Sequence, residues 1–424
     1  MLKKEDNERL TRVGPGTPMG ALLRRYWHPA LLASEIAEKD GPPVRIRLLG
    51  EDLIAFRDTK DRIGLIDAYC AHRRAPMFYG RNEDCGIRCV YHGWKFDVAG
   101  NCVDLPSLPA DSPVKAKVHI KSYPAVDKAG VIWAYMGPAD QVPPLPDYEW
   151  MRAPPTHRNV SKNYQECNYR QALEGGLDTA HSSFLHNNVL GLRRNTVRNA
   201  DVAPAIEVYP TQYGYQYVSV RNLNNEMRYV RVYHYVMPFQ QMRGDVTDDA
   251  GGRSKVPKID GHFWVPIDDY QTITWSWMYG YDKTVPITPE FAEQDEKRAG
   301  RGRDDFVPGT FKLFSNLSND HRIDRQLQKT TTFTGITGVQ TQDVAIQEGM
   351  GAIVDRSKEF LVPTDKAVIA MRRMMLEASY AVERGEKPPG LDPDSYRTVR
   401  PHDSVVPANV DWREALAEEL VAKW

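Results

Sequence analysis

The sequence predicts an α+β protein with two domains, an all-β domain followed by a larger domain that combines an antiparallel sheet with helices. Short β-rich segments separated by turns fill much of residues 44–137. Residues 138–147, PADQVPPLPD, hold four prolines in ten positions, which is typical of a linker or extended crossover. Beyond them, helical, strand-like and again helical segments follow one another. We therefore expect domains at residues 1–147 and 148–424.

The first domain begins with two predicted short helices, at residues 5–12 and 19–26, which Gly14-Pro15-Gly16-Thr17-Pro18 separates. Residues 44–50, 52–58 and 62–68 are predicted strands, because they combine β-branched residues, partial alternation and Gly or Asp punctuation. Turns at residues 99–101 and 127–130 indicate two hairpins. Together these segments favour a small antiparallel barrel or sandwich.

The second domain opens with helical spacing over residues 168–186, which turns Ala172, Leu173, Leu177 and Ala180 toward a core. Five strand-like segments follow: AIEVYP, YGYQYVSVRN, MRYVRVYHYVMPF, GHFWVPI and TITWSWMYG. Residues 245–256 and 296–309 are charged and glycine-rich, so we expect mobile loops there. VAIQEGMGAIV and DKAVIAMRRMMLEASYAVERG are predicted to be helical.

The composition is that of an ordinary globular protein. Of its 424 residues, 41% are hydrophobic and 26% charged, and the formal net charge is −1. This balance gives no indication of nucleic-acid or membrane binding. No run of about 18 apolar residues occurs, and the first residues lack the apolar core of a signal peptide. We expect a cytoplasmic protein.

The five cysteines also fit a reducing compartment, because an odd number with no evident pairing scheme favours free thiols. Cys85, Cys102 and Cys167 have no assigned role at this point. Cys85 lies only four residues before Cys89 and is therefore a possible competing ligand in the motif that follows.

Residues 70–94, CAHRRAPMFYGRNEDCGIRCVYHGW, contain four candidate metal ligands. Cys70 and His72 form a Cys-x-His pair, and after sixteen residues Cys89 and His92 form a Cys-x-x-His pair. Mixed Cys2His2 sets suit zinc or a Rieske [2Fe-2S] cluster, in which two cysteines hold one iron and two histidines the other. Because each loop supplies one ligand of each kind, the spacing favours the cluster. A structural zinc site and unrelated loop residues are the alternatives.

A second group of candidate ligands lies in LEGGLDTAHSSFLHNN, where Asp178, His181 and His186 follow the pattern D-x2-H-x4-H. Asp178 and His181 share a helix face, whereas His186 converges on the same ion only if the helix ends or turns between the histidines. Two histidines and one carboxylate form the facial triad of non-haem Fe(II) oxygenases. Two buried structural histidines are the alternative.

The combination of C-x-H-x16-C-x2-H with the later E-x3-D-x2-H-x4-H resembles the oxygenase (α) subunit of Rieske non-haem iron ring-hydroxylating oxygenases. NERLTRVGPGTPMGALLRRYW and QTQDVAIQEGMGAIVDRS further resemble the phthalate 4,5-dioxygenase group. The resemblance implies a Rieske domain followed by a helix-grip catalytic domain that binds a mononuclear Fe(II). It also implies Asp343 as the third iron ligand, with Asp355 and Glu348 as alternatives.

For Asp178 the resemblance implies a bridge between His181 and a cluster histidine, for which His92 is our candidate. In this family the contact crosses a subunit boundary, so a homotrimer or a dimer of trimers is expected. The chain has no G-x-G-x-x-G dinucleotide motif after a strand. Electrons are therefore expected from a separate NAD(P)H-dependent flavin/iron-sulfur reductase.

The expected activity is that of a terminal oxygenase, which uses these electrons and O2 to cis-dihydroxylate a small aromatic substrate, by resemblance an aromatic carboxylic acid. Monooxygenation that dealkylates an aryl ether or amine is an alternative with the same ligands. A non-catalytic iron-sulfur electron carrier is the alternative from another class. A carboxylate substrate needs a cationic partner, and Arg243 is the candidate; its other interpretation is a solvated loop residue.

Overall fold

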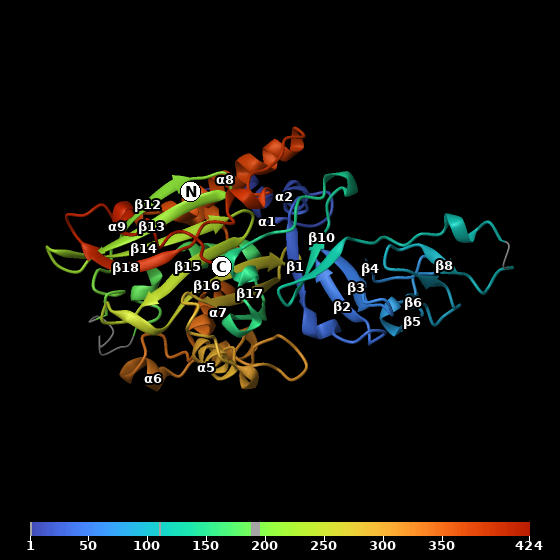
Figure 1. The fold of residues 1–424 in the computed structure, drawn as a ribbon, viewed down its shortest axis with the longest axis horizontal. Helices are drawn as coiled ribbons and strands as arrows, with labels where there is room; N and C mark the ends of the chain where they lie inside the picture. The colour runs from blue at the N-terminus through green and yellow to red at the C-terminus, as the bar shows by residue number, and fades with distance from the viewer. Residues whose placement is uncertain (1, 110–111, 188–195) are drawn as a thin grey trace. The chain divides into compact units, whose positions relative to one another are not determined.

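The computed structural model describes residues 2–109, 112–187 and 196–424, and the chain divides into two compact units (Figure 1). One unit comprises Val13–Pro143, and the other comprises Met1–Arg12 together with Pro144–Trp424. The sequence-based division placed residues 1–12 in the first domain and the boundary after residue 147. The structure differs because helix α1 (Lys4–Thr11) packs on α8 (Lys366–Glu383), where Arg9 forms an ion pair of 3.0 Å with Glu383.

The unit Val13–Pro143 consists mainly of three small antiparallel sheets, as the all-β prediction requires. Their strand orders are β1-β10-β9, β2-β3-β4 and β5-β6-β7-β8. The strand bounds are β1 Trp27–Leu32, β2 Val44–Leu48, β3 Glu51–Arg57, β4 Ile63–Asp67, β5 Arg81–Glu83, β6 Gly86–Arg88, β7 Lys95–Phe96, β8 Cys102–Asp104, β9 Ala125–Lys128 and β10 Val131–Tyr135. One short α-helix, α2 (Pro18–Leu23), precedes β1, and the side chain of Thr17 caps it.

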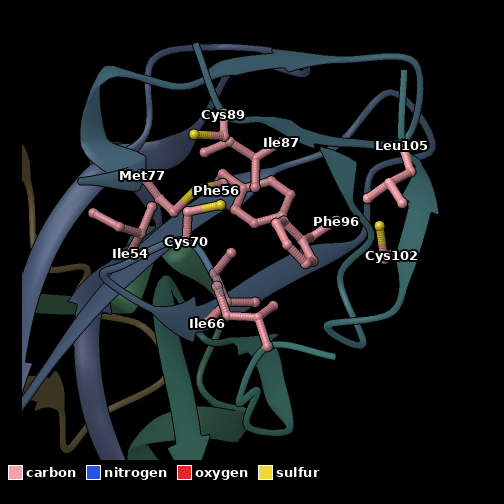
Figure 2. Close-up of a cluster of buried hydrophobic side chains, with 11 residues drawn as sticks. Ile54, Phe56, Ile66, Cys70, Met77, Ile87, Cys89, Phe96, Cys102 and Leu105 are labelled. Atoms are coloured by element: carbon pink, nitrogen blue, oxygen red, sulfur yellow. The ribbon is translucent and has the colours of Figure 1, made fainter. Parts of the chain in front are cut away.

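The core of this unit lies beneath the cysteine-containing loops. Strands β3, β4, β6 and β7 contribute fully buried side chains to one hydrophobic cluster that also includes Cys70 and Cys89. Figure 2 shows both cysteines among Ile54, Phe56 and Met77. The side chains of both cysteines are therefore packed against the hydrophobic core of this unit.

The larger unit is built on an eight-stranded antiparallel sheet in the order β11-β17-β16-β15-β14-β13-β12, with β18 paired to β14 (Figure 1). The bounds are β11 Arg158–Gln165, β12 Ala205–Pro210, β13 Gly214–Asn222, β14 Met227–Val236, β15 Gln240–Thr247, β16 Arg253–Pro266, β17 Thr272–Gly280 and β18 His402–Pro407. About five strands were predicted. Polar strands such as β11 and β15 lack the apolar alternation that sequence reasoning uses, and residues 245–256, expected as a mobile loop, supply parts of β15 and β16.

The described α-helices of this unit include four that the sequence did not predict, α3, α5, α6 and α9. Their bounds are α3 Glu149–Arg152, α4 Tyr169–Leu177, α5 Pro289–Ala299, α6 Arg325–Thr330, α7 Val339–Gly349 and α9 Trp412–Ala415, in addition to α1 and α8. Helix α4 contacts β16 and α7, and α8 contacts β12 and β13. Sheet and helices together form the expected α+β domain. No helix in the described ranges combines the length and the apolar composition that crossing a bilayer requires.

One face of the sheet carries polar side chains toward α4 and α7. Paired residues of an antiparallel sheet share a face, and every second residue of a strand lies on it. The register pairs Arg243 with Asp260, and it pairs Gln241 with His262. Alternation therefore places these four side chains on one face, which we call the cavity face.

Candidate metal centres

The two loops that carry Cys70 and Cys89 have the same backbone hydrogen bonds. The N–H of Cys70 donates to the carbonyl of Ala75, and the N–H of Arg74 donates to the carbonyl of Cys70. The second loop repeats both bonds: the N–H of Cys89 donates to the carbonyl of Trp94, and the N–H of Gly93 donates to the carbonyl of Cys89. The residue four positions after each cysteine is left-handed, with φ of 57° at Arg74 and 76° at Gly93.

These matched loops sort the four candidate ligands by type. The thiols of Cys70 and Cys89 interact with each other and are only 1% and 3% exposed. The Nδ1 atoms of His72 and His92 lie 3.2 Å apart on the outer side, and the ring of His72 stacks on that of Trp94 at 4.4 Å. A buried sulfur pair and an outer imidazole pair are the donor set of a Rieske cluster, with one pair for each iron.

The buried position of Cys70 requires a nearby cation if its thiol is to lose its proton. Burial, and then the neighbouring Cys89, raise the pKa of the Cys70 thiol to about 11, so a thiolate pair here requires compensating positive charge. Cys85 is not in the pair, because it lies in the tight turn between β5 and β6, where its N–H donates to Thr59. The donor set therefore fits an iron cluster, with Cys85 outside it.

In the larger unit, helix α4 ends where the second group of candidate ligands requires it to end. Asn168 caps its N-terminus, and Asp178 is already extended, with φ −70° and ψ 122°. His181 begins a single 3-10 turn, His181–Ser183, which redirects the chain before His186. The helix predicted over residues 168–186 is therefore interrupted, as the convergence of the two histidines demands.

Two glycines allow α4 to approach its neighbours closely. A Cβ atom at Gly175 would lie 2.3 Å from the side chain of Gln347 on α7, and one at Gly176 would lie 2.0 Å from the ring of Trp264 on β16. A side chain at Gly176 would push α4 away from the ring of Trp264, and a side chain at Gly175 would displace the amide of Gln347. The end of α4, and with it the first histidine, is thus held close to α7.

The structure brings His181, His186 and Asp343 together. The Nε2 atoms of the histidines lie 3.2 Å apart, and Oδ1 of Asp343 on α7 lies 3.4 Å from Nε2 of His181 and 3.3 Å from Nε2 of His186. Atoms bound to one ion at about 2.0–2.2 Å lie about 3 Å from one another. Two imidazoles and one carboxylate in this arrangement suit a facial Fe(II) site.

Asp178 lies behind this group. Its Oδ2 is 3.4 Å from Nδ1 of His181, and its Oδ1 accepts a hydrogen bond from the N–H of Ala180. Burial acts against the charged imidazole, yet Asp178 and Asp343 raise the pKa of His181 to about 10. The group therefore attracts positive charge, as a cation site should.

The other candidate carboxylates are engaged elsewhere. Glu348 is buried and accepts hydrogen bonds from Nε2 of His321 and the N–H of Glu166. Asp355 is near the surface, where it caps the turn Arg356–Lys358. Neither belongs to the group around His181 and His186 in the described residues. Glu174, the first residue of the E-x3-D-x2-H-x4-H pattern, is paired with Arg356 and Arg372 and has a structural role.

The three converging residues open onto a cavity of about 270 Å³, lined by α4, α7 and the cavity face. An apolar cavity of about 150 Å³ is large enough for benzene. The space therefore accommodates a benzene ring with substituents, close to Asp343 and both histidines.

Charged side chains line one part of this cavity. Arg243, the candidate partner of a substrate carboxylate, lies within β15 and not in a loop, and it forms an ion pair of 2.6 Å with Asp260. Arg231 on β14 also lines the cavity and donates to the carbonyl of Gly244, and no carboxylate lies within ion-pair distance of it in the described parts of the chain. The positive charge of Arg243 is thus neutralised by a carboxylate, whereas that of Arg231 is not. Sequence reasoning did not select it, because only the strand register reveals that it faces the cavity.

Comparisons with known proteins agree with this geometry. Residues 26–124 match the family model of the Rieske [2Fe-2S] domain, and residues 134–423 match the LigXa C-terminal domain like family. The 3-chlorobenzoate-3,4-dioxygenase oxygenase subunit of Comamonas testosteroni is 37% identical, over 99% of both chains. The phthalate 4,5-dioxygenase oxygenase subunit of Pseudomonas putida is 38% identical, over 100% of this chain and 96% of the relative.

A solved structure extends the likeness to the fold. Dicamba monooxygenase superposes with a TM-score of 0.61 at 16% identity, covering 86% of this chain and 99% of its own. All four candidate cluster ligands lie in the matched Rieske region, and the other candidate ligands lie in the second matched region. The chain therefore belongs to the Rieske oxygenases, as an oxygenase subunit similar to those of the phthalate 4,5-dioxygenase group.

Proposed function

We propose that this chain is the terminal oxygenase of a multicomponent system that cis-dihydroxylates an aromatic carboxylic acid. The observation that carries the proposal is the convergence of His181, His186 and Asp343 on one cavity. In this assignment these three residues hold a mononuclear Fe(II), and Cys70, His72, Cys89 and His92 hold the Rieske cluster. When bound, the iron supplies the activation of O2, and the cluster supplies electrons one at a time.

The protein's own residues then have distinct tasks. The cavity orients the ring beside the three iron ligands and excludes bulk water, which prevents side reactions. Arg231, with Arg243 as a second and already paired cation, attracts the carboxylate of the substrate. The two relatives named above carry 3-chlorobenzoate and phthalate in their names, and both compounds are aromatic carboxylates.

The electrons come from a separate NAD(P)H-dependent flavin/iron-sulfur reductase. Asp178 accepts the Nδ1–H of His181 and, in our proposal, the outer N–H of His92 from a neighbouring subunit. A head-to-tail contact of this kind closes as a ring, so a homotrimer or a dimer of trimers is proposed. The exposed cluster loops support this, because the Nδ1 atoms of His72 and His92 face each other at 3.2 Å, and neither Nε2 has a hydrogen-bond partner among the described residues.

The reaction balances as one arene, one O2, two electrons and two protons giving one cis-dihydrodiol. The electrons come from one NAD(P)H, and both oxygen atoms enter the product. Turnover of benzoate, phthalate and chlorobenzoates under ¹⁸O2 with an added reductase tests this. A diol with two labelled atoms is expected from these acids. Methoxybenzoates are run in parallel, and release of formaldehyde together with an unlabelled phenol would show dealkylation of an aryl ether instead.

Metal removal separates the oxygenase from an electron carrier. Chelation that removes the mononuclear iron and spares the cluster should abolish product formation, whereas a carrier would keep its electron-transfer activity. Asp343→Ala should behave like the chelated protein. Asp355→Ala is the matched control, because Asp355 is near the surface and contacts none of the three converging residues.

A further inference from the structure

Three neutral polar side chains form a row across the cavity face. Gln241 of β15 pairs with His262 of β16, and His262 pairs with Ser276 of β17. All three line the cavity. The next row along the strands is the ion pair of Arg243 and Asp260, so the neutral row borders the charged part of the cavity.

This row holds hydrogen-bonding capacity that the protein does not use. Nδ1 of His262 lies 3.0 Å from Oγ of Ser276, but its Nε2 has no partner in the described residues. Gln241 donates through Nε2 to Gly176 and Tyr217, which leaves its buried Oε1 without a partner there as well. Gln241 is 2% exposed and His262 is 7% exposed. Buried polar groups of this kind are costly unless a ligand or water satisfies them.

The imidazole of His262 is neutral. Burial, reinforced by Arg243, lowers its pKa to about 3. Its position therefore does not favour an anion, and Asp260 in the neighbouring row repels one. A hydroxyl group is suited to the row, because its O–H donates to Oε1 of Gln241 while its oxygen accepts from the Nε2–H of His262, whose Nδ1 then accepts from Oγ of Ser276. The Cβ atoms of directly paired residues lie about 4.5–5.5 Å apart, so both side chains can reach one oxygen atom.

An apolar surface for the ring that carries this hydroxyl lies beside the row. The ring of Trp264, two residues further along β16 on the same face, has its centroid 5.3 Å from that of His262. We propose that Gln241 and His262 form a subsite for a hydroxyl substituent, so that the preferred substrate is a ring-hydroxylated aromatic acid. This inference rests on the proposed function.

Equilibrium binding to the purified, full-length resting protein tests the subsite without turnover. Calorimetric titrations compare 2-, 3- and 4-hydroxybenzoate with the methylbenzoates of the same substitution pattern. At least one hydroxybenzoate should bind about 10-fold more tightly than its methyl counterpart, as one satisfied buried hydrogen bond predicts. Equal affinities within all three pairs would overturn the subsite, and this comparison needs no variant.

His262→Leu should reduce the preference for the hydroxyl to less than about threefold. The matched control is His234→Leu, because His234 is a buried histidine on the other face of the same sheet, bonded to Tyr213. A preference that survives in His262→Leu would also overturn the proposal.

The binding test of the subsite and the turnover test of the proposed function can fail independently of each other. Oxygenation of aromatic acids with no preference for a hydroxyl would refute the subsite and leave the proposed function intact. A clear preference for a hydroxyl without any oxygenation would support the subsite and refute the proposed function.

Discussion

Nδ1 of His186 lies 2.8 Å from Oε1 of Gln342, the residue directly before Asp343. Nε2 of Gln342 donates to the carbonyl of Ile336 at 2.9 Å, which fixes the orientation of the amide. Because Oε1 can only accept, His186 carries its proton on Nδ1 and presents Nε2 toward Asp343. One turn of α7 thus supplies a candidate ligand and orients another.

Removing this acceptor should weaken metal binding. We expect Gln342→Leu to lower the affinity for Fe(II) by about 10–100-fold, as is typical when an outer partner of a metal-binding histidine is lost. Gln342→Glu keeps an acceptor and should stay closer to the wild type. Fe(II) titration of the apo mononuclear site, with the cluster intact, measures both. Gln340→Leu on the same helix is the control, because Gln340 is bonded to Asn163 and Arg301 and not to the three converging residues. An equal loss there would show that α7 has merely shifted.

The matched loops predict which residues the cluster needs. His72→Ala or Cys89→Ser should abolish the visible absorption and the reduced-state EPR signal of a Rieske centre, because each removes a bond to one iron. Cys85→Ser should retain both signals, since Cys85 lies in the β5–β6 turn outside the sulfur pair. An unchanged spectrum in His72→Ala would refute the ligand assignment.

His28 should make the first unit sensitive to acid. It is fully buried, its Nε2 lies 2.9 Å from the carbonyl of Leu23, and burial lowers its pKa from 6.5 to about 3. Between these values the unfolded chain binds the extra proton, so the contribution of His28 to stability is complete above pH 6.5 and declines toward pH 3. In this range the free energy of unfolding falls by up to about 1.4 kcal/mol for each unit that the pH is lowered, as the uptake of one proton predicts.

His28→Gln tests this, because glutamine keeps a donor for Leu23 and does not titrate. Thermal unfolding midpoints recorded from pH 7.5 to pH 5 should fall less steeply in the variant than in the wild type. Parallel curves would show that other groups dominate the acid response of this unit.

The sequence predicts best those features whose parts are close together in the chain. Each cluster loop is a six-residue turn, and His181 and His186 are separated by one irregular turn, so local spacing is informative. Asp343 was reached only through family resemblance, because no local pattern relates α7 to α4. The cavity face was not predicted, since Arg231, Gln241 and His262 come together only through the strand register, and the polar strand β15 has no apolar alternation.

Asp178 offers the sharpest test of the proposed electron path. Asp178→Asn keeps the size of the side chain and one acceptor oxygen, but it removes the negative charge that polarises the imidazole of His181. Both metal centres should still bind their metals, so iron content and the cluster spectrum should match the wild type. Electron transfer from the reduced cluster to the iron should become much slower. Rapid mixing of the reduced protein with O2 and substrate measures this rate. Wild-type transfer rates would leave Asp178 with a structural role alone.

Mixed oligomers distinguish transfer between subunits from transfer within one. An Asp178→Asn chain has an intact cluster, and a His92→Ala chain has an intact Asp178 and iron site. Each is inactive alone in our proposal, but in a mixed ring the good cluster of the first chain can face the good iron site of the second. Mixing should therefore restore part of the wild-type activity. The restored share is limited by the fraction of neighbouring chains in which an intact cluster faces an intact iron site. If differently tagged chains co-purify and remain inactive, transfer takes place within one subunit, because then no chain contains an intact path.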